Sequence, residues 1–305
     1  MFKFEREQKI FDIAGVKVGG QPGELPTVLI GSIFYSGQEI ISDEKKGIFD
    51  KGKCETLINK LESLSELTTN PFMLDIPAAT EEAFVKYIDY VADVTEVPFL
   101  IDVFSPTLKI SAAKHTVEIG LAERAVYNSI QKETTDEELE AIRNLGLKSA
   151  VLLAYDAQDE SASGRLNTIR DILSMSEKAG IEKDFFDTAI PAFGIGIGAA
   201  TRALHLIKEN YGDRGVVGVH TANVTDTCNW AKKNLSEEVR RACDASQNAI
   251  MAVLGADWIM FGPVESADYI FPAIAIIDTY IITATAELGI NPAQEGKHPI
   301  FKLMQ

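Results

Sequence analysis

The chain has few of the residues that build disulfide, metal and nucleic-acid sites. Its 305 residues include three cysteines and four histidines, and no two cysteines form a CxxC pair. This excludes a disulfide framework, and the spacing of the candidate ligands His220, Cys228 and Cys243 fits no zinc pattern, so we predict no metal. Acidic residues outnumber basic ones by 45 to 29, and no run of Lys or Arg exceeds two. No nucleic-acid partner is therefore expected.

The chain also lacks the apolar segments that direct a protein into a membrane. Its first 15 residues alternate charged and apolar side chains and contain no apolar block of signal-peptide length. The longest apolar stretch, Tyr269–Ala286, contains Asp278 and has Pro272 near its start, so we expect a buried helix there. The net charge of −16 disfavours an anionic membrane surface. We expect a cytoplasmic protein without direct membrane insertion.

A repeated unit of alternating apolar runs and helical patterns fills the chain. No low-complexity linker divides it, so residues 1–305 are predicted to form a single domain. Eight apolar runs, each short and bounded by turn residues, are typical of strands buried on both faces of a parallel sheet. These runs are residues 28–34, 72–76, 98–104, 125–130, 149–155, 185–190, 216–220 and 258–261.

Each apolar run is followed by a segment with helical spacing, such as Leu57, Leu61 and Leu64 after the first. Ser105, Thr135 and Ser236 stand at expected N-caps. Glycines occupy the expected left-handed C-caps at positions 120, 146, 180, 212, 255 and 289. Eight strands, each followed by a helix, predict a (β/α)₈ TIM barrel. Residues 9–20 alternate around Gly15, which predicts an N-terminal β-hairpin that closes one end of the barrel.

Polar residues stand at the carboxyl ends of the predicted strands, where a barrel carries its active site. Taken singly, each could pair with a neighbour or cap the next helix. Asp102, Asn128 and Asp187, however, come from three strands and would converge on one cavity. Two carboxylates and an amide suit a ligand with a fused donor and acceptor edge, such as an aminopyrimidinone. The polar strand-end residues are Asp75, Asp102, Asn128 with Ser129, Asp156, Asp187, His220 with Asn223, and Glu265.

The segment after the sixth strand contains Gly194, Gly196 and Gly198, followed by Ala199, which formally matches G-x-G-x-x-A. A dinucleotide site also requires an acidic residue at the end of the next strand, where Val219 and His220 stand instead. We therefore predict close approach of the backbone to a ligand or helix at these glycines.

Several blocks of the sequence resemble the H subunit (MtrH) of tetrahydromethanopterin S-methyltransferase and the related methyltransferases that act between methylcorrinoid proteins and tetrahydrofolate or tetrahydromethanopterin. The resemblance extends over essentially the whole chain, and the opening block is specific. More distantly, the strand ends resemble those of pterin-binding barrels. The blocks are GGQPGELPTVLIGSIFY at 19–35, DEKKGIFDK at 43–51, VKYIDYVADVTEVPFLID at 85–102, YNSI at 127–130 and FGPVESADYIFPAIAIID at 261–278.

The resemblance implies a methyltransferase of one-carbon metabolism that moves a methyl group between a corrinoid (cobalamin) carried by a partner protein and N5 of tetrahydrofolate or tetrahydromethanopterin. It implies that Asp102, Asn128 and Asp187 hold the pterin ring, with Asp75 and Ser129 beside them. By the same resemblance, the catalytic amide of Asn223 faces N5. The resemblance also implies a homodimer and a separate corrinoid protein that docks over the barrel mouth.

Two other functions fit the same fold. The barrel could be a scaffolding subunit of a membrane-bound methyltransferase complex, although the set of Asp102, Asn128, Asp187 and Asn223 favours activity. A pterin-synthesis enzyme of the dihydropteroate synthase kind would need a basic residue near the barrel mouth for a pyrophosphate leaving group. Arg202 and Lys208 are the basic residues that follow the sixth-strand glycines, and both fall within a predicted helix.

Overall fold

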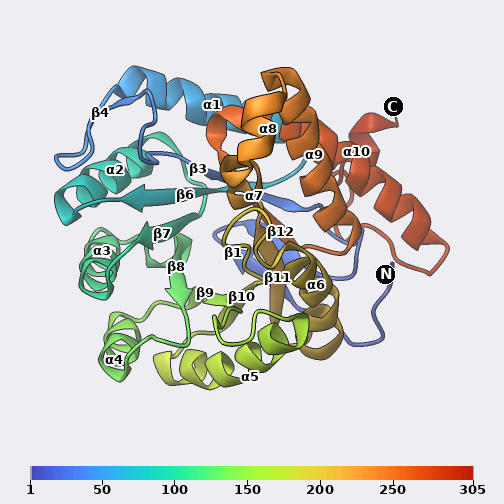
Figure 1. Cartoon of the computed structure of the whole chain (residues 1–305), viewed down its shortest axis with the longest axis horizontal. Helices are drawn as coiled ribbons and strands as arrows, with labels where there is room; N and C mark the ends of the chain where they lie inside the picture. Colours follow the sequence, from blue (N-terminus) through green and yellow to red (C-terminus); the bar gives the residue numbers. More distant parts are fainter. Residues whose placement is uncertain (1, 305) are drawn as a thin grey trace.

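The structure is a computed structural model that describes residues 2–304, and at its centre eight parallel strands form a closed barrel (Figure 1). Each strand pairs with the next in chain order, and β12 pairs with β3 to close the ring. The predicted runs correspond to these strands, so the predicted TIM barrel is confirmed. The barrel strands are β3 (Val28–Ser32), β6 (Phe72–Ala78), β7 (Phe99–Val103), β8 (Ala125–Ile130), β9 (Ser149–Leu153), β10 (Lys183–Asp187), β11 (Gly215–His220) and β12 (Trp258–Pro263).

A ring of helices surrounds the barrel, and their ends follow the predicted capping residues. Ser105, Thr135 and Ser236 each accept a hydrogen bond from the backbone N–H three residues later. The helices that follow the eight strands are α1 (Lys51–Thr68), α2 (Glu81–Val94), α3 (Pro106–Glu118), α4 (Asp136–Leu145), α5 (Ala162–Ala179), α6 (Ile197–Tyr211), α9 (Glu237–Val253) and α10 (Ala267–Ala286).

Glycine at the helix C-termini has two different roles. Gly146 and Gly180 end α4 and α5 in the left-handed conformation, as predicted. The same prediction is wrong for Gly212, which ends α6 with a φ of −60°. The side chain of Gln8 lies where a Cβ of Gly212 would be. Close packing, and not a positive φ, therefore requires glycine at position 212.

An apolar layer fills the barrel interior, and an N-terminal hairpin covers its lower end. The hairpin consists of β1 (Ile10–Ile13) and β2 (Val16–Gly19), which pair antiparallel. Its side chains Phe11, Ile13 and Val18 are buried in the inner cluster, which confirms the predicted hairpin. The strand residues of this cluster are Val28, Ile30, Met73, Leu100, Val126, Val151, Phe185, Val216, Trp258 and Met260.

Two buried carboxylates tie the helices to the N-terminal ends of the strands. Asp278 of α10 accepts hydrogen bonds from the backbone and hydroxyl of Thr27, at 2.9 and 2.7 Å, and from the Asn70 amide at 2.7 Å. Asp257 forms an ion pair of 2.5 Å with Lys208 of α6 and accepts from the backbone N–H of Val217 at 2.7 Å. Both oxygens of each carboxylate are therefore bound at this end.

The apolar stretch near the C-terminus forms α10, which packs against α1 and α9. Of the residues that the structure describes, one segment, Val264–Ala286, is long and apolar enough to cross a membrane on length and composition alone. Its residues Phe271, Ile274 and Asp278 are buried against the barrel wall. The predicted buried helix is confirmed for this face.

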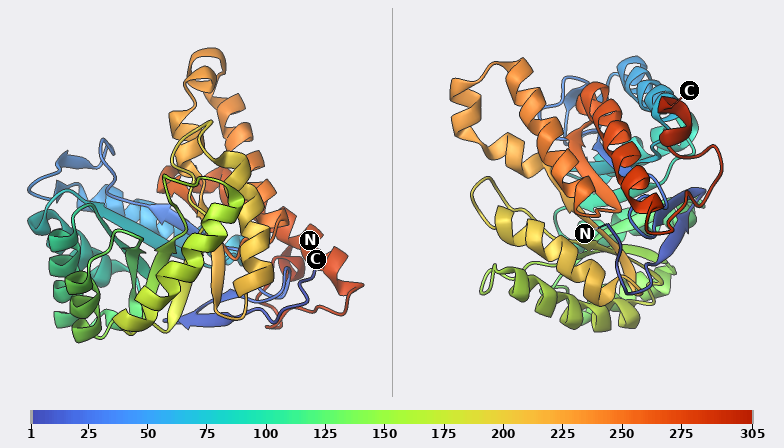
Figure 2. Two further views of the ribbon diagram at one scale, coloured as in Figure 1. Left: turned by 60° about the horizontal axis from the view of Figure 1, so that its bottom comes forward. Right: turned by 90° about the vertical axis from the view of Figure 1, so that its right-hand side faces the viewer.

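Short elements that the sequence pattern does not predict interrupt the repeated unit. A small hairpin, β4 (Ile41–Asp43) with β5 (Ile48–Phe49), precedes α1, and α11 (Ile300–Leu303) ends the fold. After β11 the chain forms α7 (Ala222–Thr227) and α8 (Asn229–Asn234) before it enters α9. In the left view of Figure 2, α8 and the start of α9, in orange, project from the barrel on the side away from the dark-blue hairpin. The insertion therefore stands beside the C-terminal mouth.

Candidate active site

A layer of polar side chains lies directly above the apolar interior of the barrel. Alternate residues of a barrel strand face inward, so the inward phase of each strand can be followed from the apolar layer toward its carboxyl end. In that phase, Asp102 follows Leu100, Asn128 follows Val126 and Asp187 follows Phe185. The polar layer consists of Ser32, Asp75, Asp102, Asn128, Asp187 and His220.

Strand register brings the predicted residues of this layer together. Asp102 of β7 and Asn128 of β8 are direct partners in the ladder. Asp75 lies beside Ser32, whose hydroxyl donates to one Asp75 oxygen at 2.7 Å. The other oxygen of Asp75 is buried without a hydrogen-bond partner. A buried oxygen in this state is costly unless a ligand or water satisfies it, which makes this end a candidate binding site.

Burial raises the pKa of all three carboxyls of the polar layer. The pKa of Asp75 lies well above its usual value because of burial and the nearby Asp102 charge. Burial raises the pKa of Asp102 to about 6, although the Lys109 ammonium opposes this shift. Burial likewise raises the pKa of Asp187 to about 6, against the stabilising backbone N–H groups of Ala189 and His220. These carboxyls are therefore poised to accept hydrogen bonds from a ligand that supplies compensating N–H groups.

A buried lysine supports the β8 side of the layer. Lys109 of α3 donates to the carbonyl of Ser129 at 3.2 Å and lies 3.7 Å from the Glu138 carboxylate. The Tyr127 hydroxyl donates to the same carboxylate at 2.6 Å. The register of the ladder shifts between Asn128 and the residue after Ser129, so Ser129 lies at a bulge. The structure thus places Ser129 next to the site with its carbonyl bound to Lys109.

A fully buried arginine fixes the loop that leaves β10 after Asp187. Arg165 of α5 donates to the carbonyls of Thr188 at 2.7 Å and Ala189 at 3.0 Å, and also to that of Glu160. A Cβ on Gly196 would lie 2.6 Å from this guanidinium, which confirms the predicted close approach at that glycine. The other two glycines of the motif, at 194 and 198, have open space around them, so no helix approaches them closely, and close approach to a ligand there stays a prediction.

Asn223 lies on α7, beside the mouth and not on a strand end. Its side-chain amide nitrogen donates to the carbonyl of Ile190 at 3.0 Å. This bond links α7 to the loop after β10 and leaves the amide oxygen and the second N–H of the amide for a ligand. Asn223 can therefore act as an acceptor or as a donor.

Sequence reasoning missed Ser32, Lys109 and Arg165, and it gave the strand-end His220 no role in binding. Ser32 could have been found from the two-residue phase of its strand, which places it in line with Ile30. Burial lowers the pKa of His220 to about 4, so its imidazole is neutral at pH 7. The two cations reach the site from helices, and strand periodicity carries no signal for them.

The basic residue required by the pterin-synthesis alternative is not supplied by Lys208. Its side chain is 1% exposed and pairs with Asp257 at the opposite end of the barrel. Lys208 also donates to the carbonyl of Gly20, just after the N-terminal hairpin. It is therefore a structural group of the lower end.

Comparison with known proteins decides the family. Residues 6–293 match the family model of the tetrahydromethanopterin S-methyltransferase MtrH subunit. The same subunit of this enzyme from Methanothermobacter thermautotrophicus is 39% identical and is covered, like this chain, over its full length. Its counterpart from Methanopyrus kandleri is 40% identical, with 96% of this chain and 97% of the relative covered. This chain belongs to the MtrH family. The resemblance seen in the sequence blocks is confirmed, and the chain is a member of a methyltransferase family.

Solved structures share the barrel of this MtrH-family chain. The dihydropteroate synthase of Yersinia pestis, solved with a pterine-sulfa conjugate, has a TM-score of 0.60 at 16% identity and covers 91% of this chain and 99% of its own. The Coxiella burnetii enzyme, solved with pteroic acid, has a TM-score of 0.59 at 13% identity, with the same coverage. At this level of identity the likeness establishes the shared fold.

Proposed function

We propose that this MtrH-family chain transfers a methyl group between a corrinoid bound to a partner protein and N5 of a tetrahydropterin, either tetrahydromethanopterin or tetrahydrofolate. The observation that carries the proposal is the polar layer, in which the buried carboxyls of Asp75 and Asp187 and the half-buried side chains of Asp102 and Asn128 stand on an apolar floor. Family membership supports the methyl-transfer reaction, and the names of the relatives support tetrahydromethanopterin as the pterin.

The donor set of the layer fits a reduced pterin ring. The ring carries an aminopyrimidinone edge with adjacent N–H donors, which carboxylates such as Asp102 and Asp187 accept. The Asn128 amide can serve an edge that has one donor and one acceptor. The unpartnered oxygen of Asp75 provides a further acceptor in the buried floor. A ligand of this kind would satisfy groups that the protein leaves unpaired.

The charge that develops at N5 explains why the site is acidic. The corrinoid supplies the cobalt that carries the methyl group, and the chain's residues bind and orient the pterin. N5 would form the new bond to carbon with its lone pair while the carbon–cobalt bond breaks and leaves its electron pair with the corrinoid. N5 then becomes a cation, which loses its proton; in reverse, N5 must be protonated before it can leave. The amide oxygen of Asn223 and the nearby carboxyls stabilise this cation electrostatically. Orientation of the two reactants supplies a further part of the rate.

The partner that we propose is a corrinoid protein that docks over the mouth. Large aromatic side chains are exposed on the segments that follow the strands, with Phe104 92% exposed after β7 and Trp230 65% exposed on α8. Phe193, after β10, is half-exposed. Exposed aromatics around a concave site are typical of a protein interface. We further propose that the protein is a cytoplasmic homodimer. Sedimentation equilibrium would measure the mass of the assembly and test this.

Calorimetry and a single-turnover assay test the proposed function. Wild-type protein should bind tetrahydromethanopterin or tetrahydrofolate with one site per chain. With a methylated corrinoid protein and the bound pterin, the cobalt absorbance should change in a single turnover as the methyl group leaves. A protein that binds neither pterin, or that binds one and transfers no methyl group, would contradict the proposal.

A further inference from the structure

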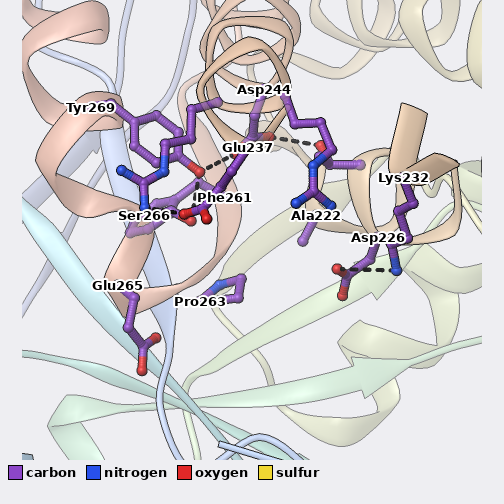
Figure 3. A pocket seen from close by; sticks show the side chains of 13 residues that line it. Ala222, Asp226, Lys232, Glu237, Asp244, Phe261, Pro263, Glu265, Ser266 and Tyr269 are labelled. Carbon is purple, nitrogen blue, oxygen red and sulfur yellow. Dashed lines mark hydrogen bonds and ion pairs between the residues drawn. The ribbon is translucent and has the colours of Figure 1, made fainter. Parts of the chain in front are cut away.

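A polar pocket of about 240 Å³ opens beside the barrel mouth on the β11 and β12 side (Figure 3). In Figure 3, Tyr269 and Ser266 lie on one side of the pocket, and Asp226 and Lys232 lie on the other. The loops after β11 and β12, together with the N-terminal turn of α9, form its walls. The loops after the seventh and eighth strands form the phosphate-binding region in many TIM barrels.

The acidic residues of this pocket are bound to other protein groups. Glu237 pairs with Arg241 in the first turns of α9. Asp244 accepts from the hydroxyl of Tyr269 at 2.9 Å, among other partners. Glu265 accepts from the side chain of Gln38 at 2.9 Å. The fourth acid, Asp226, lies 4.0 Å from Lys232.

Two of the basic residues that line the pocket, Lys232 and Arg241, are paired with acidic residues, whereas Arg240 has no such partner in the described part of the chain. Its guanidinium makes no ion pair and no hydrogen bond with the residues from 2 to 304, whereas Arg241 pairs with Glu237 and lies 5.8 Å from the Tyr269 ring. The Nε atom of Arg240 is buried without a partner. A buried N–H of a charged group is costly when unpaired, so an added acceptor in the pocket would be stabilising. A carboxylate or phosphate matches the geometry of a guanidinium.

The first residues that line the pocket follow closely in sequence after a residue of the polar layer. His220 ends β11 in that layer, and Ala222, two residues later, lines the pocket. A Cβ on Gly262 would lie 2.5 Å from the Cβ of Ala222, so glycine lets the end of β12 lie against the start of α7. The backbone N–H of His220 also binds the carboxyl of Asp187. The chain therefore places the pocket beside the His220 edge of the polar layer.

We propose that this pocket binds the anionic tail of the tetrahydropterin substrate and that Arg240 is the residue that pairs with it. The inference rests on the proposed function and adds a second subsite to it. Tetrahydrofolate carries carboxylates on its tail, and tetrahydromethanopterin carries carboxylates and a phosphate. Both tails supply the acceptor that Arg240 lacks, and the ring remains with the polar layer.

Calorimetry with three probes tests the assignment. Tetrahydrofolate and tetrahydromethanopterin carry anionic tails, and 6-methyltetrahydropterin carries none. Arg240→Gln should weaken the binding of a tailed pterin by about 10- to 100-fold, because a charge-assisted pair is lost. The same variant should bind 6-methyltetrahydropterin as the wild type does. Arg214→Gln is the matched control, since Arg214 directly precedes β11, at the opposite end of the barrel, and is paired with Glu177.

The three probes separate the possible outcomes. A loss confined to tetrahydromethanopterin places Arg240 at an anionic group that tetrahydrofolate does not supply there, and a loss for both tailed pterins places it at a group that both tails supply. Equal losses for all three probes, no loss for any, or a loss in Arg214→Gln as large as in Arg240→Gln would overturn the tail subsite. If wild-type protein binds no probe, the proposed function itself fails. If the wild type binds all three with equal affinity, the tail subsite alone fails. Circular dichroism of each variant verifies folding.

Discussion

The carboxylates at the two ends of the barrel differ in how many of their oxygens are bound to protein groups. At the lower end, Asp257 and Asp278 have both oxygens bound to protein groups. At the mouth, one oxygen of Asp75 has no partner, and the carboxyl of Asp102 makes no hydrogen bond within the described part of the chain. A paired carboxylate holds elements together, whereas an unpaired one raises the free energy of the unliganded protein. The difference supports our proposal that the mouth binds the ligand, whereas the lower end stabilises the fold.

Breaking the lower end should have the largest effect. Lys208→Met removes the partner of Asp257 and leaves a buried carboxylate without its cation, which should lower the free energy of unfolding by about 3–5 kcal/mol. Urea denaturation followed by circular dichroism measures the change. In Lys208→Met with Asp257→Asn, the charge is gone and part of the stability should return. A loss below about 1 kcal/mol in the single variant would show that this pair does not hold the lower end.

Breaking the mouth should affect binding more than folding. Asp187→Ala removes a carboxyl that we expect to accept a charge-assisted hydrogen bond from the pterin, at a cost on the order of 1.5–3 kcal/mol of binding. Its free energy of unfolding should fall less than that of Lys208→Met, because the backbone N–H groups of Ala189 and His220 lose an acceptor but no buried charge is left without its partner. Calorimetry with tetrahydrofolate and tetrahydromethanopterin measures the first effect, and urea denaturation the second. Unchanged affinity for both pterins would remove Asp187 from the site.

Asn223 sharpens the comparison within the mouth, because it should act on the rate more than on affinity. Its interaction with N5 strengthens only as the cation forms, so Asn223→Ala should bind the pterin nearly as wild type and transfer the methyl group roughly tenfold or more slowly. Single-turnover kinetics with a methylated corrinoid protein isolates this step. Wild-type rates in both directions would show that Asn223 only links α7 to Ile190.

The fold could be predicted from the sequence because its signals are local. Each strand is an apolar run between turn residues. N-cap residues such as Ser105 and Thr135 accept a hydrogen bond from the backbone N–H three residues later in the chain. The positions of Asp102, Asn128 and Asp187 at the mouth follow from the same signal, since parallel strands all end there.

The rest of the site depends on tertiary packing and could not be predicted. Arg165 and Lys109 lie on helices, and only the curvature of the barrel brings their side chains to the loop after β10 and to the end of β8. The insertion α7–α8 has short helices without side-chain caps, so no local pattern marks it. Asn223 therefore takes its position from a contact with Ile190 that is 33 residues distant in the chain.

The smallest expected effect is that of metal removal. Within residues 2–304, no group of three or more His, Cys, Asp and Glu side chains is arranged to hold a metal ion. The neutral His220 lies in the polar layer, where we expect the pterin to bind. Cys228 is buried between α7 and α8, in an apolar pocket with Trp230. Zinc chelation should therefore leave methyl transfer unchanged, and elemental analysis of active protein should find no stoichiometric zinc. One zinc per chain, lost together with activity on chelation, would contradict this and make His220 and Cys228 the first residues to substitute.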